Sequence, residues 1–420
     1  MLVLSAPKNI LNSTINLTGS KSINNRLLIL NEVLGLHLSF ENMSTSEDTL
    51  LLQNVLLSIK NKNSGTIDVH HAGTDMRFLT AYLSTKKGEW ILTGSERMKE
   101  RPIGDLVKAL KSLGAEITFL EKENFPPLKI TGKTLKGGTI EIDGSVSSQF
   151  VSALLLIAPT FENGLELTLK NEIVSWPYIQ MTLDILSEFG LKVSTFLNTI
   201  KFSKSLIAVP KSIIYKVESD WSSASYWFSL VALCENAEIK LTGLKNKSSQ
   251  ADAILPELYK QFGVTSTFKN NELILSQNPN INPDFEYDFT NCPDIAQTIA
   301  VTCFGLGINA KLTGLKTLKL KESDRIVALK TELEKFGAQV IITENSIQIQ
   351  DSGLWTQDCR LESKDLKIDT YNDHRMAMCF APLSMRYEQV QIQNPKVVSK
   401  SYPQFWEDLK SVGFSVNLLP

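Results

Sequence analysis

Basic and hydroxyl side chains gather where a polar stretch of the chain turns into an apolar one. The segment TGSKSINNRLLIL, residues 18–30, places Lys21 and Arg26 at the start of an apolar helix pattern. A lysine near a glycine suggests a P-loop, but that motif needs the lysine directly after a glycine, and here Ser20 separates Gly19 from Lys21. The P-loop interpretation therefore fails, while phosphate binding by other means stays open.

Five further segments also pass from polar residues into an apolar helix pattern. They read AGTDMRFLTAYL, VSSQFVSALLLIAP, WSSASYWFSLVAL, CPDIAQTIAVTCF and YNDHRMAMCFA. The polar residues at or near their starts are Thr74, Arg77, Ser147, Ser148, Gln149, Asp220, Ser222, Ser223, Asp294, Asn372, His374 and Arg375. A helix that is apolar on every face is buried, and a Ser, Thr, Asp or Asn at its start can supply the N-cap.

These helix starts are suited to bind anions. A helix N-terminus carries about half a positive charge and N–H groups without helical partners, and lysine and arginine add donors for phosphate and carboxylate. For a single Ser, Thr or Asp, capping alone is the commoner explanation. Arg26, Arg77 and Arg375, however, oppose the helix dipole at equivalent positions. If the helix starts converge, the pattern predicts a small ligand with several negative charges.

A second series of helices alternates with the first and reveals a repeat. Amphipathic patterns end in an aliphatic or phenylalanine residue and a glycine, and an alternating strand pattern follows. We expect these glycines to cap helix C-termini with positive φ. At intervals of about 75 residues they are Gly114, Gly190, Gly263, Gly337 and Gly413. With residues 48–59 as a candidate sixth copy, the repeat predicts an α/β protein of two similar domains, each of three units.

The bulk composition excludes several classes of protein. The chain has 420 residues, 43% of them hydrophobic, and a formal net charge of −2, so neither nucleic acid nor a membrane is an expected partner. The five cysteines form no C-x-x-C pair, which favours a reducing compartment. Neither a signal-peptide pattern nor an apolar run of about 20 residues is found, so we expect a cytoplasmic protein.

Ten motifs follow one another from end to end: GSKSINNR, AGTDMRFLTA, RMKERPIGDLV, SSQF, SWPYIQMT, SDWSSASY, PDIAQT, KESDR, YNDHRMAM and KSYP. With them the chain resembles the EPSP synthase (3-phosphoshikimate 1-carboxyvinyltransferase) branch of the enolpyruvyl transferase family. The resemblance implies two domains of three βαβαββ-type units, an inside-out α/β barrel whose buried helix starts face the interdomain cleft. The implied boundaries are 1–18 with 218–420 for the phosphoenolpyruvate side and 19–217 for the 3-phosphoshikimate side.

The resemblance also implies a reaction. The family transfers the enolpyruvyl (1-carboxyvinyl) group of phosphoenolpyruvate to the 5-hydroxyl of 3-phosphoshikimate and releases phosphate, in the shikimate pathway to chorismate and the aromatic amino acids. Both substrates are multiply charged anions, in agreement with the prediction from the helix starts. The resemblance implies no metal ion or organic cofactor, the two small molecules as partners and a monomer. The family is the target of glyphosate.

Residue by residue, the resemblance assigns two binding sets. Gly73 is implied to matter because a methyl group there would crowd the phosphoenolpyruvate pocket. The 3-phosphoshikimate set is Lys21, Ser22, Arg26, Ser147, Ser148, Gln149, Ser175, Tyr178, Asp294 and Lys321. The phosphoenolpyruvate set is Lys21, Gly73, Arg101, Gln149, Arg325, Arg375 and Lys400.

Three residues are expected to move protons. The reaction delivers a proton to the methylene carbon, removes one from the hydroxyl and, when phosphate leaves, removes one from the new methyl group. We expect Asp294 to take the hydroxyl proton as general base, and Glu322 and Lys21 to act at the methylene and phosphate ends. On its sequence position alone, Glu322 could equally be a solvated surface carboxylate.

The chain departs from the family pattern at several positions. Asp75 replaces the alanine of AGTAMR, Trp176 the lysine of SKPY and Trp221 the alanine of DASSA. Thr317 stands where several relatives place an asparagine, so that contact is not transferred. The adjacent His70 and His71 invite a metal interpretation, but no carboxylate or cysteine lies at ligand spacing.

Two alternatives remain. The related enzyme that acts on UDP-N-acetylglucosamine usually has a reactive cysteine on a loop of the 19–217 domain, but no cysteine precedes Cys234 and the loop reads RMKERPIG. A non-catalytic anion-binding relative would have no use for the carboxylates of Asp294 and Glu322 facing an anion.

Overall fold

The computed structural model describes residues 1–203, 212–350 and 366–419, and Cys359 lies outside these ranges. The chain forms two compact units. Unit 1 consists of Met1–Gly19, Thr45–Glu47 and Glu218–Pro420, and unit 2 of Ser20–Ser44 and Asp48–Val217. Within the described ranges, no helix combines the length and apolar character that a membrane crossing requires.

The described residues of unit 2 form two four-stranded sheets and one parallel pair of strands. Its strands are β3 (His37–Glu41), β4 (Ser64–Asp68), β5 (Gly88–Thr93), β6 (Glu116–Phe119), β7 (Leu128–Gly132), β8 (Gly138–Asp143), β9 (Leu165–Lys170), β10 (Val193–Phe196), β11 (Thr199–Phe202) and β12 (Ser212–Lys216). The sheets have the orders β4-β5-β7-β6 and β8-β9-β11-β10, and β12 pairs with β3. In β5, Trp90 and Leu92 are buried whereas Glu89 and Ile91 are exposed, as the period of a half-buried strand requires.

Unit 1 repeats the same strand order three times. Its strands are β1 (Leu2–Ser5), β2 (Ile10–Asn16), β13 (Ala237–Thr242), β14 (Phe262–Lys269), β15 (Glu272–Ile281), β16 (Asp284–Asp288), β17 (Asn309–Thr313), β18 (Gln339–Ile342), β19 (Ile347–Gln350), β20 (Lys367–Ile368), β21 (Val390–Ile392) and β22 (Ser415–Leu418). The sheets run β2-β13-β15-β14, β16-β17-β19-β18 and β20-β21-β1-β22. Each begins with a parallel pair and continues antiparallel, so the predicted repeat is confirmed.

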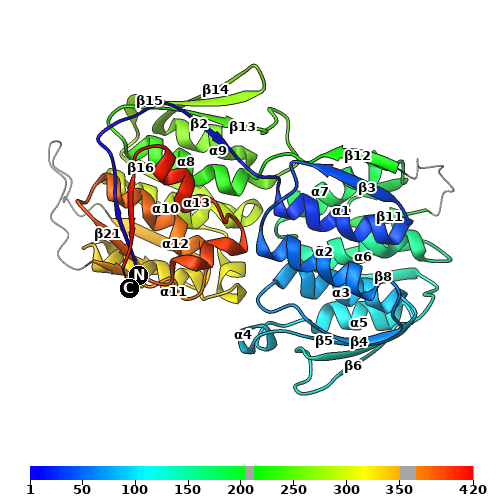
Figure 1. Cartoon of the computed structure of the whole chain (residues 1–420). Helices are drawn as coiled ribbons and strands as arrows, with labels where there is room; N and C mark the ends of the chain where they lie inside the picture. Colours follow the sequence, from blue (N-terminus) through cyan, green and yellow to red (C-terminus); the bar gives the residue numbers. More distant parts are fainter. Residues whose placement is uncertain (204–211, 351–365, 420) are drawn as a thin grey trace. The chain divides into compact units, whose positions relative to one another are not determined.

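Three buried helices form the centre of each unit. They are α1 (Lys21–Leu34), α3 (Gly73–Thr85) and α6 (Ser148–Ile157) in unit 2, and α8 (Trp221–Leu233), α10 (Ala296–Leu306) and α12 (His374–Phe380) in unit 1. The three helices of each unit pack against one another, and Figure 1 shows α8, α10 and α12 side by side. The prediction of one apolar, buried helix in each repeat is correct.

The amphipathic helices form the second series. They are α2 (Glu47–Ile59), α5 (Gly104–Ser112), α7 (Trp176–Glu188), α9 (Leu255–Lys260), α11 (Arg325–Lys335) and α13 (Phe405–Ser411), and a short α4 (Glu96–Lys99) precedes α5. Short 3-10 helices are η1 (Ala158–Thr160), η2 (Ala251–Ile254), η3 (Phe289–Asn291), η4 (Pro293–Ile295), η5 (Lys316–Leu320), η6 (Ala381–Met385) and η7 (Pro395–Lys400).

Four of the five repeat glycines end helices as predicted. Gly114, Gly190, Gly337 and Gly413 have positive φ, and the N–H of each bonds a carbonyl of the last helical turn. For Gly263 the predicted positive φ is confirmed, but the predicted position at a helix end is wrong. That residue lies inside β14 at a bulge, where a side chain would collide with the backbone of β15, so close approach of two strands explains this glycine.

The N-cap prediction is correct for two of the six buried helices, in which Ser147 and Asp220 accept a hydrogen bond from an N–H of the first turn. In α12 the cap is Asp373, which sequence reasoning did not name, and not Asn372. For α1, α3 and α10 the prediction is wrong, because no side-chain capping bond is found among the described residues and the helices begin next to Ser20, Ala72 and Ile295. First-turn N–H groups without a side-chain cap stay available to other acceptors.

Candidate active site

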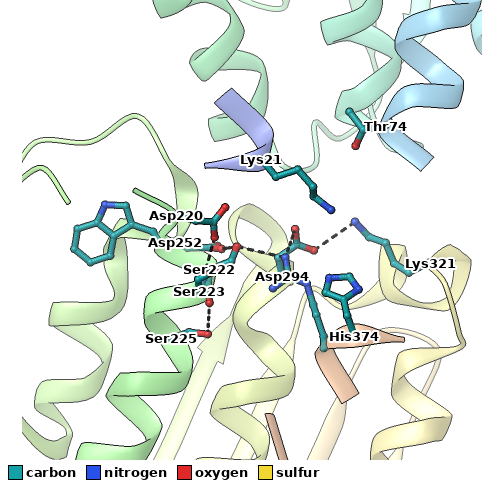
Figure 2. A network of polar contacts seen from close by, with 12 residues as sticks. Lys21, Thr74, Asp220, Ser222, Ser223, Ser225, Asp252, Asp294, Lys321 and His374 are labelled. Atoms are coloured by element: carbon teal, nitrogen blue, oxygen red, sulfur yellow. Dashed lines mark hydrogen bonds and ion pairs between the residues drawn. The ribbon is translucent and has the colours of Figure 1, made fainter. Parts of the chain in front are cut away.

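In unit 1, three cations surround the carboxylate of Asp294. This residue lies in η4, directly before α10. Its Oδ2 is 3.0 Å from Nη2 of Arg375, and its Oδ1 is 3.5 Å from Nζ of Lys321 and 3.4 Å from Nη1 of Arg325. Figure 2 shows Lys321 directed at Asp294. Four residues that the sequence assigned to substrate binding thus form one cluster.

The surrounding charges determine the protonation of Asp294. Burial alone raises the pKa of this carboxyl group, but the positive charges of Arg375, Lys321 and Arg325 outweigh burial. The resulting pKa lies well below the ordinary value of an aspartate. Asp294 is therefore an anion at neutral pH, as a proton acceptor must be, but its basicity is low while the three cations remain in place.

Arg325, at the start of α11, joins three carboxylates in the interior of unit 1. Its Nε lies 2.8 Å from Asp373 Oδ2, and its Nη2 lies 3.0 Å from Glu322 Oε2 and 3.3 Å from Asp373 Oδ1. Burial lowers the pKa of Arg325, but the negative charges of Asp373 and Glu322 raise it above its usual value. Sequence reasoning missed Asp373, although an aspartate directly before a helix start is a recognisable cap signal.

Glu322 is an enclosed carboxylate. Its Oε1 lies 2.6 Å from Nζ of Lys400, at the end of η7, while Oε2 binds Arg325. The side chain of Glu322 is 13% exposed and that of Lys400 9%. The alternative of a solvated surface carboxylate is wrong, because Glu322 is mostly buried and pairs with two mostly buried cations, Arg325 and Lys400.

In unit 2, the head of α1 is bound to α2 and α3. Lys21 Nζ lies 3.0 Å from Asp48 Oδ2. One turn later, Asn25 accepts a hydrogen bond from Thr49 at 2.7 Å and donates one to Asp75 at 2.8 Å. Asp75, which replaces the alanine of the family pattern, is therefore a buried residue whose hydrogen bond links α3 to α1. The role of Asp48 was missed by sequence reasoning.

Arg26 is a buried tie between three helices. Its guanidinium group donates to Thr182 Oγ1 at 2.8 Å, to Ser152 Oγ at 3.2 Å and to the carbonyls of Ser22 and Tyr178 at 2.8 and 3.0 Å. Burial lowers its pKa to about 10. The bonds to Thr182, Ser152 and Tyr178 join α1 to α6 and α7, so Arg26 has a structural role.

The starts of α3 and α6 lie close to each other and to Arg101. Gln149 Nε2 donates to Thr74 Oγ1 at 3.1 Å. A Cβ atom on Gly73 would lie 2.8 Å from the guanidinium carbon of Arg101, so the close contact predicted at Gly73 involves this arginine. Arg77 donates to the carbonyls of Gly73 and Pro102 and holds the loop around Arg101 against α3.

The remaining predicted residues of unit 2 lie at helix starts as well. Ser147 caps α6, and Ser148 is the first residue of that helix. Ser175 has a positive φ of 56° directly before α7, and Tyr178 lies in the first turn of that helix. The predicted helix start at Ser147 and Ser148 is confirmed, and the contacts of all four residues with substrate stay predictions.

Three further positions at which the chain differs from the family pattern are Trp221, His71 and Trp176. Trp221 is buried in unit 1, where its indole N–H donates to Glu218 at 2.9 Å. His71 Nδ1 lies 2.9 Å from Ser95 Oγ, and the described residues contain no group of three side chains that could hold a metal ion. Trp176 begins α7, and nothing in the structure explains its choice over lysine.

Both units present the same kind of site. Side chains from the starts of α8, α10 and α12 contact one another in unit 1, as do those from α1, α3 and α6 in unit 2. Each set combines buried arginines with the N-termini of three helices, which favours anionic groups. The fold and these two sets define an α/β protein of repeated units suited to bind small, multiply charged anions.

Comparison with known proteins identifies the family. A family model described as EPSP synthase (3-phosphoshikimate 1-carboxyvinyltransferase) matches residues 57–409. The 3-phosphoshikimate 1-carboxyvinyltransferase of Bacteroides fragilis strain YCH46 is 43% identical over 420 residues, covering 99% of this chain and 98% of that protein. The chain belongs to the EPSP synthase family, so the resemblance found in the sequence is confirmed and the UDP-N-acetylglucosamine alternative is not favoured.

Solved structures share the fold. An EPSP synthase from Acinetobacter baumannii aligns with a TM-score of 0.75 at 22% identity, over 99% of this chain and 100% of that one. The enolpyruvyl transferase NikO from Streptomyces tendae aligns with a TM-score of 0.75 at 15% identity, over 99% and 98% of the two chains. The predicted enolpyruvyl transferase fold is confirmed.

Proposed function

We propose that the protein transfers the 1-carboxyvinyl group of phosphoenolpyruvate to the 5-hydroxyl of 3-phosphoshikimate and releases phosphate. The family membership supports this reaction, and so does the chemistry of the cluster around Asp294. A protein that only binds anions gains nothing from a buried glutamate between Arg325 and Lys400, whereas a proton-transfer reaction needs such a group.

The two units divide the substrates in this proposal. Unit 1, with Arg325, Arg375 and Lys400, is the phosphoenolpyruvate side, and Glu322 lies among these cations. Unit 2, with Arg26 and the starts of α6 and α7, is the 3-phosphoshikimate side. Lys21, Gly73, Arg101 and Gln149 complete the phosphoenolpyruvate set, and Asp294 and Lys321 the 3-phosphoshikimate set.

Substrate binding prepares Asp294 for its role in this proposal. Arg375 and Lys321 both contact Asp294, and both belong to a predicted set for an anionic substrate. When an anion recruits these cations, the carboxylate loses the charges that keep its pKa low, and its basicity rises. Asp294 then takes the proton of the 5-hydroxyl, while Glu322 and Lys21 act at the methylene carbon and the departing phosphate.

One assay tests the reaction. The purified protein is incubated with phosphoenolpyruvate alone, with phosphoenolpyruvate and 3-phosphoshikimate, and with phosphoenolpyruvate and UDP-N-acetylglucosamine, and released phosphate is measured. We expect release only with 3-phosphoshikimate. Release with the nucleotide sugar, or without any acceptor, would overturn the proposal.

A further inference from the structure

Asp252 is a buried carboxyl group that the proposed reaction does not use. It lies in η2 of unit 1 and is 3% exposed. Ser222 Oγ donates a hydrogen bond to its Oδ2. Its Oδ1 is buried and has no hydrogen-bond partner among the described residues. A full negative charge in this position is therefore poorly stabilised.

A chain of contacts links Asp252 to Asp294. Arg375 Nη2 lies 3.3 Å from Ser222 Oγ and 3.0 Å from Asp294 Oδ2, so the contacts run from Asp252 through Ser222 and Arg375 to Asp294. Figure 2 shows Asp252 and Ser222 beside each other, with Asp294 next along the network. The two carboxyl groups are thus linked through one guanidinium group, with Ser222 between that group and Asp252.

The charges around Asp252 favour its neutral form. Burial and the negative charge of Asp294 raise the pKa of Asp252 to about 7, although Arg375 and the hydrogen bond from Ser222 act in the opposite direction. Asp220, at the start of α8, adds a smaller upward contribution. The Cys292 thiol also faces this region and remains neutral, because burial and then Asp252 raise its pKa.

We propose that Asp252 is a positioning residue whose proton decides how Arg375 is shared. While Asp252 is neutral, Arg375 stays with Asp294 and with the anion that it binds. When Asp252 is ionised, a second negative charge competes for the same guanidinium group and repels an anionic substrate. This inference rests on the proposed function, because it takes Arg375 to be a ligand of phosphoenolpyruvate.

The kinetic test compares wild type with Asp252→Asn, which keeps the shape of the side chain and cannot ionise. We expect the KM for phosphoenolpyruvate to rise in wild type between pH 6 and pH 8 and to change much less in the variant. If binding shifts the pKa of Asp252 upward by one unit, the extra rise is about fivefold by pH 8 and approaches about tenfold at higher pH. The phosphate of the substrate also titrates near pH 6, so only the difference between the two proteins is diagnostic. If the KM for phosphoenolpyruvate depends on pH in the same way in wild type and in Asp252→Asn, the proposal is overturned.

Two variants sharpen this comparison. Ser222→Ala removes the hydrogen bond that lowers the pKa of Asp252, so the rise in KM should move to higher pH. Glu286→Gln removes an exposed carboxylate of the same unit that pairs with Lys311 at 2.6 Å, and the variant should show the wild-type dependence of KM on pH. A shift to lower pH in Ser222→Ala would contradict the proposed link.

A measurement without substrate separates this inference from the proposed function. Folding raises the pKa of Asp252, so the stability that this group contributes is complete below pH about 4 and is lost as the pH rises towards 7. The thermal midpoint of wild type should therefore fall relative to that of Asp252→Asn over this range. If the thermal midpoints of the two proteins depend on pH in the same way, the inference about Asp252 is refuted and the proposed function is unaffected. Absence of phosphoenolpyruvate turnover refutes the proposed function.

Discussion

Arg375 holds Asp294 at 3.0 Å and Ser222 at 3.3 Å with a single Nη2 atom, so one side chain joins the start of α12 to the starts of α10 and α8. The predicted anion ligand and the predicted general base are therefore partners of each other. Because the same arginine lowers the pKa of Asp294, the basicity of the carboxylate depends on where the guanidinium group is engaged.

Asp294→Ala tests the role of this carboxylate in turnover. We expect a loss of at least about 100-fold in kcat, the range of general base catalysis, with much smaller changes in the binding of either substrate measured by calorimetry. Asp284→Ala, which removes an exposed carboxylate from β16 of the same unit, serves as control. Unchanged turnover in Asp294→Ala would exclude Asp294 from the mechanism.

The pH dependence of stability tests the ion pairs of Asp294. The folded state lowers the pKa of this group, so its stabilising contribution is present above the unfolded pKa of about 4 and is lost as the pH falls below that value. Arg375→Gln removes the cation with the largest lowering effect. The free energy of unfolding in urea, measured between pH 3 and pH 7, should fall less on acidification in this variant than in wild type. An equal fall in both proteins would contradict the ion pair of Asp294 with Arg375.

Arg325→Ala should be among the most destabilising changes in unit 1. It leaves Asp373, Glu322 and Asp294 without their shared cation, and breaking a buried ion pair from one side costs about 3–5 kcal/mol. Arg325→Lys should recover only part of this loss, because lysine cannot bind Asp373 with two nitrogens. Chemical denaturation measures the free energy of unfolding of both variants, and Lys311→Ala, at an exposed position, is the control. A loss below about 1 kcal/mol for Arg325→Ala would contradict the stabilising role of Arg325.

The sequence predicted the parts of the fold that depend on local pattern. Apolar helices such as α6 and the glycines after α5, α7, α11 and α13 are determined by periodicity and by φ. Gly263 was misassigned because its requirement comes from β15, a partner strand that local pattern does not reveal. The caps of α1 and α3 were misassigned because Lys21 and Gly73 already belong to their helices.

The sequence named several residues that the structure brings together, but it did not name all of their partners. Asp294, Glu322, Arg325 and Arg375 were named from motifs, and the structure brings them together in unit 1. Their neighbours Asp373 and Asp252, and Asp48 beside Lys21, were missed. Contacts between residues distant in sequence depend on tertiary packing, and a single sequence gives no signal for an acidic partner on another helix.

Gly73→Ala should weaken the binding of phosphoenolpyruvate with little loss of stability. The added methyl group meets the guanidinium group of Arg101, which is the far end of a flexible side chain and can move aside. We expect the KM for phosphoenolpyruvate to rise at least about tenfold, a change of about 1.4 kcal/mol, while the thermal midpoint stays near that of wild type. A lowered midpoint with unchanged KM would show that the helix start, and not Arg101, is disturbed.

Arg26 offers a test of structure against binding in unit 2. Three of its four hydrogen bonds join α1 to α6 and α7, and the fourth goes to the Ser22 carbonyl within α1; each buried partner left unsatisfied costs about 1–3 kcal/mol. Arg26→Ala should therefore lose at least about 3 kcal/mol of unfolding free energy, and Arg26→Lys less, because it keeps a charge and fewer donors. Lys201→Ala, an exposed partner of Glu166, provides the surface control. If Arg26→Lys unfolds like wild type and only the KM for 3-phosphoshikimate rises, the residue is a substrate ligand and not a tie between helices.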